Sequence, residues 1–196
     1  DAAITFDASA GYTSYQWSGT GGSTDATQTT SGTTAGTYVV HVVDANGCKD
    51  TATATLTVNT KPTVTLRDTS ICSGDAAITF DAGAGYTSYQ WSGTGGSTDA
   101  TQTTSGTIAG TYVVHVVDGN TCKDTATVTL TMNTKPIVTL RDTTICSGDV
   151  AITFDASAGY TSYQWSGTGG STDATQTTSG ITAGTYVVHV VDANGC

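Results

Sequence analysis

Hydrophobic and polar residues alternate with a period of two along most of the chain, as they do in half-buried β-strands. Residues 36–45 place Tyr38, Val40 and Val42 on one face, and residues 51–58 place alanine, leucine and valine opposite a row of threonines. The same alternation predicts further strands at residues 3–8, 14–19 and 63–68, with a short, weak strand within 26–31. No segment has the pattern of a helix longer than one turn.

Glycine-containing turns separate the predicted strands. They occur at Ala10-Gly11, at residues 19–22, at Ser31-Gly32 and at Asn46-Gly47, and Asn-Gly is typical of a tight hairpin turn. The segments between them are rich in threonine, valine and tyrosine, which favour strands. The pattern therefore predicts an all-β protein.

The whole pattern repeats along the chain. A segment that begins at Asp1 recurs almost unchanged from Asp75 and from Asp149, so the residue number of each position rises by 74 from one copy to the next. Each period has six or seven predicted strands and one tryptophan expected in the core, which favours a small antiparallel β-sandwich. We expect three repeats, at residues 1–60, 61–134 and 135–196.

The limits of the repeats suggest that the chain is a fragment. Residues 59–62, which end in Pro62, read as a linker, because the residue before a proline favours an extended conformation. The 196 residues present are too few for three complete periods, and the third copy stops before the equivalent of segment 49–74. On these boundaries the first repeat is expected to lack its first strand and the third its last strand.

The charge excludes two kinds of partner. All 16 acidic residues are aspartates, and only six lysines and arginines oppose them, which gives a net charge of −10. Binding to nucleic acid or to an anionic membrane depends on clustered basic residues, so neither is expected. No run of apolar residues approaches the length of a membrane-spanning helix, and no membrane insertion is expected in this segment.

Five cysteines alternate between two contexts, spaced by 24, 50, 24 and 50 along the chain, which predicts the disulfide framework of an exported protein. One connectivity pairs Cys72 with Cys122 and Cys146 with Cys196, closing loops of about 50 residues, each worth roughly 4 kcal/mol. The other pairs Cys48 with Cys72 and Cys122 with Cys146. We favour the first connectivity. The second would require residues 59–62 to form the turn of a hairpin, whereas these residues are more typical of an extended linker. No CxxC motif or histidine pair indicates a metal site.

One predicted strand carries apolar residues on both faces. Val39 and Val43 flank His41 on the face opposite Tyr38 and Val40. Either this second face is covered within the domain, or it forms a contact with another repeat or another chain. We predict that this face forms a contact with another repeat or another chain. Protonation of the histidine between the valines would then place a positive charge in that contact. The equivalent residues are Val113, His115, Val117, Val187, His189 and Val191.

Short motifs recur in each copy, and they resemble the immunoglobulin-like and PKD-like repeats of large secreted surface proteins of Bacteroidota, including gliding-motility adhesins. The motifs are ICSGD at residues 71–75, YQWS at 89–92, GTYVV at 110–114 and DGNTC at 118–122. The resemblance implies tandem immunoglobulin-like sandwiches and an extracellular protein exported by a dedicated secretion system.

Two functions are consistent with this sequence. The first is the non-catalytic structural array of an extracellular filament or fibre on a bacterial surface, which would self-associate. It is favoured because residues 1–48 and 149–196 differ at only two positions, and a binding site needs only one copy. The alternative is the stalk of a cell-surface adhesin that presents a distal binding domain.

Enzymatic activity and cofactors are not expected. The recurring histidine, His41 in the first repeat, has no serine or cysteine nucleophile specified beside it. Residues 44–47 look like half of a calcium loop but lack its later ligands. The threonine row at residues 51–57 could form an ice-binding face, but outward threonines are also ordinary in strands. The sequence does not specify a ligand.

Overall fold

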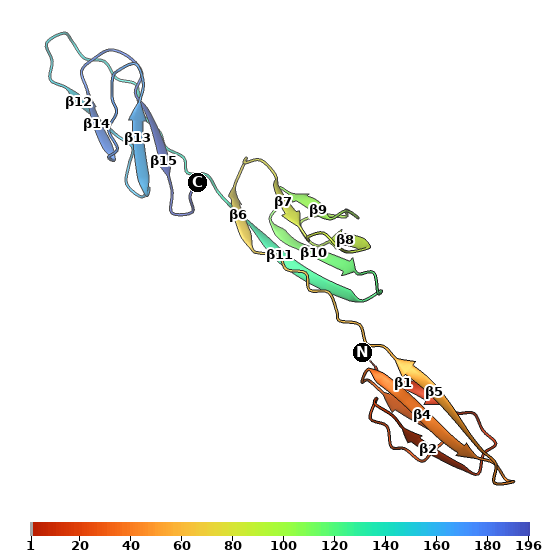
Figure 1. Cartoon of the computed structure of the whole chain (residues 1–196). Helices are drawn as coiled ribbons and strands as arrows, with labels where there is room; N and C mark the ends of the chain where they lie inside the picture. The colour runs from red at the N-terminus through yellow and green to blue at the C-terminus, as the bar shows by residue number, and fades with distance from the viewer. Residues whose placement is uncertain (1) are drawn as a thin grey trace. The chain divides into compact units, whose positions relative to one another are not determined.

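A computed structural model describes residues 2–196, and in that range it contains fifteen β-strands and no helix (Figure 1). The prediction of an all-β protein is therefore confirmed. The chain divides into two compact units, residues 1–61 and 62–196. The first unit holds the first repeat. The predicted boundary after residue 134 lies within the second unit and stays a prediction.

The first unit contains two small sheets. In one, β1 pairs antiparallel with β3, and in the other the strand order is β2-β4-β5. The strands are β1 (Ile4–Asp7), β2 (Ser14–Ser18), β3 (Thr29–Gly32), β4 (Gly36–Val43) and β5 (Lys49–Leu56). The Asn46-Gly47 turn joins β4 to β5 as predicted, with Gly47 at a φ of 77° that suits glycine.

In the second unit the equivalent strands recur with the period of the sequence, but the larger sheet has four strands in the second repeat and two in the third. Strands of the second repeat are β6 (Thr69–Cys72), β7 (Ile78–Asp81), β8 (Ser88–Ser92), β9 (Thr103–Gly106), β10 (Gly110–Val117) and β11 (Lys123–Asn133). Strands of the third repeat are β12 (Ile152–Asp155), β13 (Ser162–Ser166), β14 (Thr177–Gly180) and β15 (Val187–Val191). Strands equivalent to β1, β2, β3 and β4 therefore occur in all three repeats.

The core of each repeat lies between its two sheets. Trp17, Trp91 and Trp165 are all buried, as predicted, with at most 4% of each side chain exposed. The Trp91 indole donates a hydrogen bond to the Thr101 carbonyl oxygen at 2.9 Å, which satisfies its one polar atom. Across the core, the ring of Phe80 on β7 contacts the ring of Tyr112 on β10, with centroids 4.7 Å apart.

The four-stranded sheet of the second repeat, with order β6-β11-β10-β8, is not purely antiparallel. Its strand β6 runs parallel to β11, with Cys72 opposite Asn133. A parallel pair needs a long crossover, and nearly the whole repeat lies between these two strands. The predicted antiparallel sandwich is therefore wrong for this one pair.

Segment 63–68 does not form the predicted strand. Val64 is nevertheless buried and Leu66 packs against the core, as their alternation suggested. The backbone N–H of Val64 donates to the Asp124 carboxylate at 2.8 Å, and that of Thr129 donates to Asp68 at 2.7 Å. Side-chain carboxylates thus take the place of some ladder hydrogen bonds.

The length of a strand depends on which neighbouring strands it pairs with, as a comparison of the repeats shows. In β10, residues 110–112 pair only with β11, whereas residues 113–117 also pair with β8. The third repeat has no strand equivalent to β11 among the described residues, and its β15 begins at Val187, the equivalent of Val113. Burial also differs with pairing. Leu130 on β11, which pairs with both β10 and β6, is 1% exposed, whereas its equivalent Leu56 on β5, which pairs only with β4, is partly buried.

Candidate functional site

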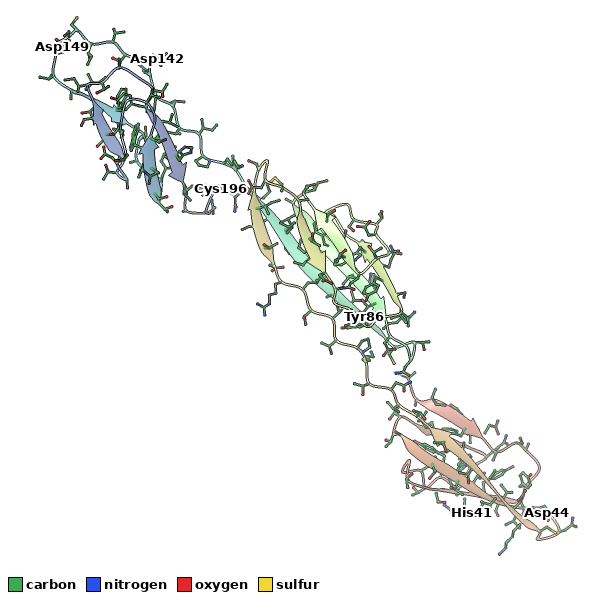
Figure 2. All side chains as sticks on the ribbon, turned by 45° about the horizontal axis from the view of Figure 1, so that its top comes forward. His41, Asp44, Tyr86, Asp142, Asp149 and Cys196 are labelled. Carbon is green, nitrogen blue, oxygen red and sulfur yellow. A yellow bond between two sulfur atoms is a disulfide. The ribbon has the colours of Figure 1, made fainter. Side chains whose placement is uncertain are left out.

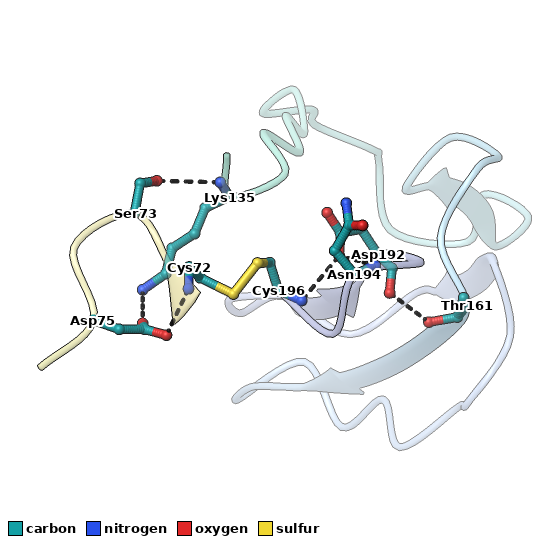
Figure 3. Close-up of a disulfide and its surroundings, with 8 residues drawn as sticks. All are labelled: Cys72, Ser73, Asp75, Lys135, Thr161, Asp192, Asn194 and Cys196. Carbon is teal, nitrogen blue, oxygen red and sulfur yellow. Dashed lines mark hydrogen bonds and ion pairs between the residues drawn. A yellow bond between two sulfur atoms is a disulfide. The ribbon is translucent and has the colours of Figure 1, made fainter. Parts of the chain in front are cut away.

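A disulfide bond joins the second repeat to the third. It connects Cys72, at the end of β6, to Cys196, in the turn that follows β15, with their Cα atoms 5.6 Å apart (Figure 3). This separation is in the usual range for a disulfide. The two residues are 124 positions apart in the sequence, so the bond closes a large loop.

The turn that carries Cys196 is held by the carboxylate of Asp192. This carboxylate accepts the backbone N–H of Asn194 at 2.8 Å and that of Cys196 at 2.9 Å. The backbone N–H of Asp192 donates in turn to the Cys196 carbonyl oxygen at 2.8 Å. An aspartate that binds its own backbone two residues on is a common turn former. The Asp-X-Asn-X-Cys motif therefore positions the cysteine.

The other cysteine lies in a second aspartate-held turn. The Asp75 carboxylate accepts the backbone N–H of Cys72 at 3.2 Å and forms an ion pair with Lys135 at 2.8 Å. The Lys135 side chain, together with the Cys72 N–H, holds the pKa of Asp75 below its ordinary value. Lys135 also donates its backbone N–H to the Ser73 hydroxyl at 3.2 Å. The segment after β11 is thereby fixed to the Cys72 turn.

Neither predicted connectivity is present. Cys72 bonds Cys196, and Cys48, Cys122 and Cys146 are free thiols. Cys122 immediately precedes the first residue of β11, whereas Cys72 lies opposite its last residue. Ten residues of extended strand separate these positions by roughly 33 Å, far more than a disulfide spans. The predicted pairing of Cys72 with Cys122 is therefore wrong.

The predicted bond between Cys146 and Cys196 is also absent, because Cys196 is bonded to Cys72 and Cys146 is a free thiol. Figure 2 shows Asp142 and Asp149, which flank the Cys146 segment in the sequence, at the end of the third repeat opposite Cys196. The alternative pairs also do not form, since Cys48 and Cys122 are both free. Sequence spacing gave the distance along the chain but not the end of the domain at which each cysteine lies.

The valine and histidine residues of the predicted contact point away from the core. On β10, Tyr112, Val114 and Val116 are buried, whereas Val113 and Val117 are half-buried and His115 is exposed. The same order holds for Val39, His41 and Val43 on β4. In the third repeat Val187, His189 and Val191 are all exposed. The contact itself stays a prediction.

Polar side chains surround this outward face. Val113 lies between Ser92 on β8 and Thr127 on β11, and His115 lies between Gln90 and Thr125. The imidazole Nδ1 of His115 is 2.8 Å from the Thr125 hydroxyl, and that of His41 is 2.9 Å from the Thr51 hydroxyl. We call the face formed by Val113, His115 and Val117, with its equivalents, the valine–histidine face.

The Asp44 turn uses its carboxylate on the backbone. Asp44 accepts the N–H groups of Asn46 and Cys48, each at 2.8 Å, and the Cys48 N–H is the main reason that the pKa of Asp44 is lowered.

Among residues 2–196, no three histidine, cysteine, aspartate or glutamate side chains are placed to hold a metal ion together. The same residues include no helix with the length and hydrophobicity that a membrane crossing needs.

A groove in the third repeat lies between residues 140–148 and 180–187. These segments are equivalent to the regions of β6 and β10 that flank β11 in the second repeat. The groove therefore lies where β11 lies in the second repeat, and we interpret it as the place of that strand rather than as a ligand pocket.

The class of protein that these observations define is an all-β tandem repeat protein with an inter-repeat disulfide. No protein-family model matches the chain, and no curated protein matches its sequence.

Proposed function

We propose that this chain is a non-catalytic structural array of an extracellular filament or fibre on a bacterial surface, built from immunoglobulin-like, PKD-like repeats. The observation that carries the proposal is that the repeats have the same interior contacts at a fixed interval. The hydroxyl pairs Ser23–Thr30, Ser97–Thr104 and Ser171–Thr178 all lie at 2.6 Å. Identical modules at a constant spacing give a regular rise along a fibre.

The valine–histidine face supports self-association. Two half-buried valines recur on the outward side of β4 and β10, where a strand with one solvated face usually carries polar residues. Because the copies are nearly identical, any contact made by this face recurs once in every repeat. A self-complementary patch that repeats without closing a ring extends into an open fibre.

An adhesin stalk is the second candidate, and the disulfide favours it. A covalent bond between the second and third repeats resists separation of the modules under tension, which a stalk needs whether or not it binds other chains. Both functions place the protein outside the cell, where a disulfide persists. They differ in whether several chains associate.

Electron microscopy of the secreted protein on its bacterium tests the proposal. Labelling with an antibody against the repeat identifies the structures that contain it, and mass-per-length measurement gives the number of chains in the cross-section. A filament body predicts labelled fibres with two or more chains. Solitary labelled strings of one chain would instead support the stalk and contradict the filament.

A further inference from the structure

The disulfide connects cysteines of different type in successive repeats. Cys72 belongs to the ICSGD motif of the second repeat, and Cys196 ends the Asp-X-Asn-X-Cys motif of the third. Their separation of 124 residues is one full period plus the spacing from Cys72 to Cys122, which are the two motif cysteines within one repeat. No other two cysteines of this chain have that separation, and no other two are bonded in the part described.

The free cysteines lie in the same local structures as the bonded ones. The Cys146 N–H donates to Asp149 at 2.8 Å, as the Cys72 N–H does to Asp75. In the other motif, the N–H groups of Cys48 and Cys122 donate to Asp44 and Asp118 at 2.8 and 2.9 Å, as that of Cys196 does to Asp192 at 2.9 Å. Each free thiol is therefore held in the turn that a bond requires.

Bonding within a repeat is prevented by the length of the sheet. The two motifs lie at opposite ends of β11, roughly 33 Å apart along the strand. A cysteine of the ICSGD motif therefore needs a partner from another repeat. The following repeat supplies one, because the turn after its β10-type strand is the one that meets Cys72 here.

We propose that this bond recurs at every junction of the repeat array. The ICSGD cysteine of each repeat is joined to the Asp-X-Asn-X-Cys cysteine of the following repeat, so Cys146 is the position that bonds a following repeat. Each bond forms when two thiols lose two protons and two electrons to a disulfide donor. The donor, a small-molecule or protein disulfide, is reduced to two thiols in the exchange.

The recurring bonds would form overlapping loops. A bond from Cys146 to the following repeat begins inside the loop that Cys72 and Cys196 close. The shortest covalent path along the array then runs from Cys72 through the disulfide to Cys196, and from Cys196 along the chain to the next ICSGD cysteine. This last segment is equivalent to the one between Cys122 and Cys146, and the whole path covers two repeats. A fully stretched array would extend only by these linking segments, which are a small fraction of its sequence. The array would thus resist extension even with its domains unfolded.

An extended chain tests the proposal. A copy of residues 49–122 is added after Cys196, which continues the period, and the protein is oxidised in a glutathione redox buffer. Free thiols are alkylated, and non-reduced peptides are mapped by mass spectrometry. The expected result is two bonds, Cys72 to Cys196 and Cys146 to the last cysteine of the added segment. A Cys146→Ser variant is the control, in which the last cysteine is expected to be alkylated while the bond from Cys72 to Cys196 remains.

Two outcomes would overturn the proposal. One is alkylation of Cys146 in the extended chain although Cys72 and Cys196 are bonded, because the bond would then not recur. The other is a bond between two cysteines of the same repeat, such as Cys72 with Cys122. Neither outcome depends on whether the array forms filaments, so the disulfide proposal and the proposed function fail separately.

Discussion

Cys72 and Cys122 lie at opposite ends of strand β11, Cys72 opposite Asn133 and Cys122 immediately before Lys123. They are too far apart to bond one another, and Cys72 is instead bonded to Cys196, which closes a loop of 124 residues. A loop of this size makes the denatured chain more compact, so the oxidised protein should migrate faster than the reduced protein on a denaturing gel.

Cysteine variants should divide into two groups on that gel. Cys72→Ser and Cys196→Ser are expected to abolish the faster migration, because each removes one end of the bond. Cys122→Ser and Cys146→Ser are expected to keep it, since both thiols are free. Loss of the fast species in the Cys122 variant would contradict the assigned pairing.

Removal of the core tryptophan should strongly destabilise the second repeat. Trp91 is 1% exposed, and truncation of such a side chain to alanine costs roughly 3–5 kcal/mol in free energy of unfolding. Chemical denaturation followed by the circular dichroism of the sheet measures this cost. A loss below about 1 kcal/mol, the range of surface substitutions, would show that the indole is not in the core.

A glycine beside Tyr112 provides a test of packing. A Cβ atom on Gly95 would overlap the Tyr112 ring, which is 1% exposed and unable to move aside. Gly95→Ala should therefore lower the free energy of unfolding by roughly 1–3 kcal/mol, as overpacking does. Gly119→Ala is the matched control, because a Cβ there has no neighbouring atom within 4 Å and the change should be nearly neutral. Equal effects at both positions would contradict the described packing.

Acid should weaken a contact between β7 and the segment before β9. Asp81 accepts hydrogen bonds from the Gln102 amide and the Gly83 N–H, and these lower its pKa, with Gln102 the larger cause. A carboxyl group with a lowered pKa in the folded state stabilises that state above the unfolded value, near pH ~3.9. This stabilisation is lost as the pH falls through the lower, folded-state pKa.

Carboxyl titration by NMR checks this directly. Gln102→Ala should raise the pKa of Asp81 toward its ordinary value, because the main hydrogen bond is removed. The equivalent groups Asp7 and Asp155 keep their glutamine partners in this variant and serve as internal controls. An unchanged titration of Asp81 would show that the Gln102 hydrogen bond does not determine its pKa.

The valine–histidine face should matter for assembly rather than for folding. Changing Val113 and Val117 to threonine is expected to weaken association of the full-length protein, measured by sedimentation velocity. The melting temperature should change little, because both side chains lie half-buried on the outward face. If the variant unfolds readily and associates normally, the face is part of the domain's own packing and the filament proposal loses its support.

The sequence predicted those parts of the fold that depend on local pattern. Alternation predicts most strands and the buried face of β10, and the Asn-Gly pair predicts the turn at Asn46-Gly47, because each follows from neighbouring residues. It did not predict the parallel pairing of β6, which joins residues as distant in the sequence as Thr69 and Leu130. Val64 and Leu66 follow the alternation of residues 63–68 and do pack in the core, but side-chain carboxylates replace the expected strand pairing there.

The disulfide was missed for a physical reason. The equal spacings from Cys72 to Cys122 and from Cys146 to Cys196 suggested a loop within each repeat, but spacing does not show at which end of the sheet a cysteine lies. The signal was the length of the strand pattern after Cys122, which continues to Asn133. A strand of eleven residues carries the chain to the far end of the domain, away from Cys122. That Cys72 also lies at this end depends on the parallel pairing of β6 with β11, which the sequence pattern does not show.

Single-molecule pulling on the chain by its two ends tests most directly whether a disulfide between Cys72 and Cys196 joins the second repeat to the third. The oxidised chain should extend only outside the loop that Cys72 and Cys196 close. Reduction should release the 124 residues of that loop and add roughly 400–450 Å of extended length. A gain of only roughly 330–360 Å, as two separate loops of about 50 residues would give, or no gain at all, would contradict the account.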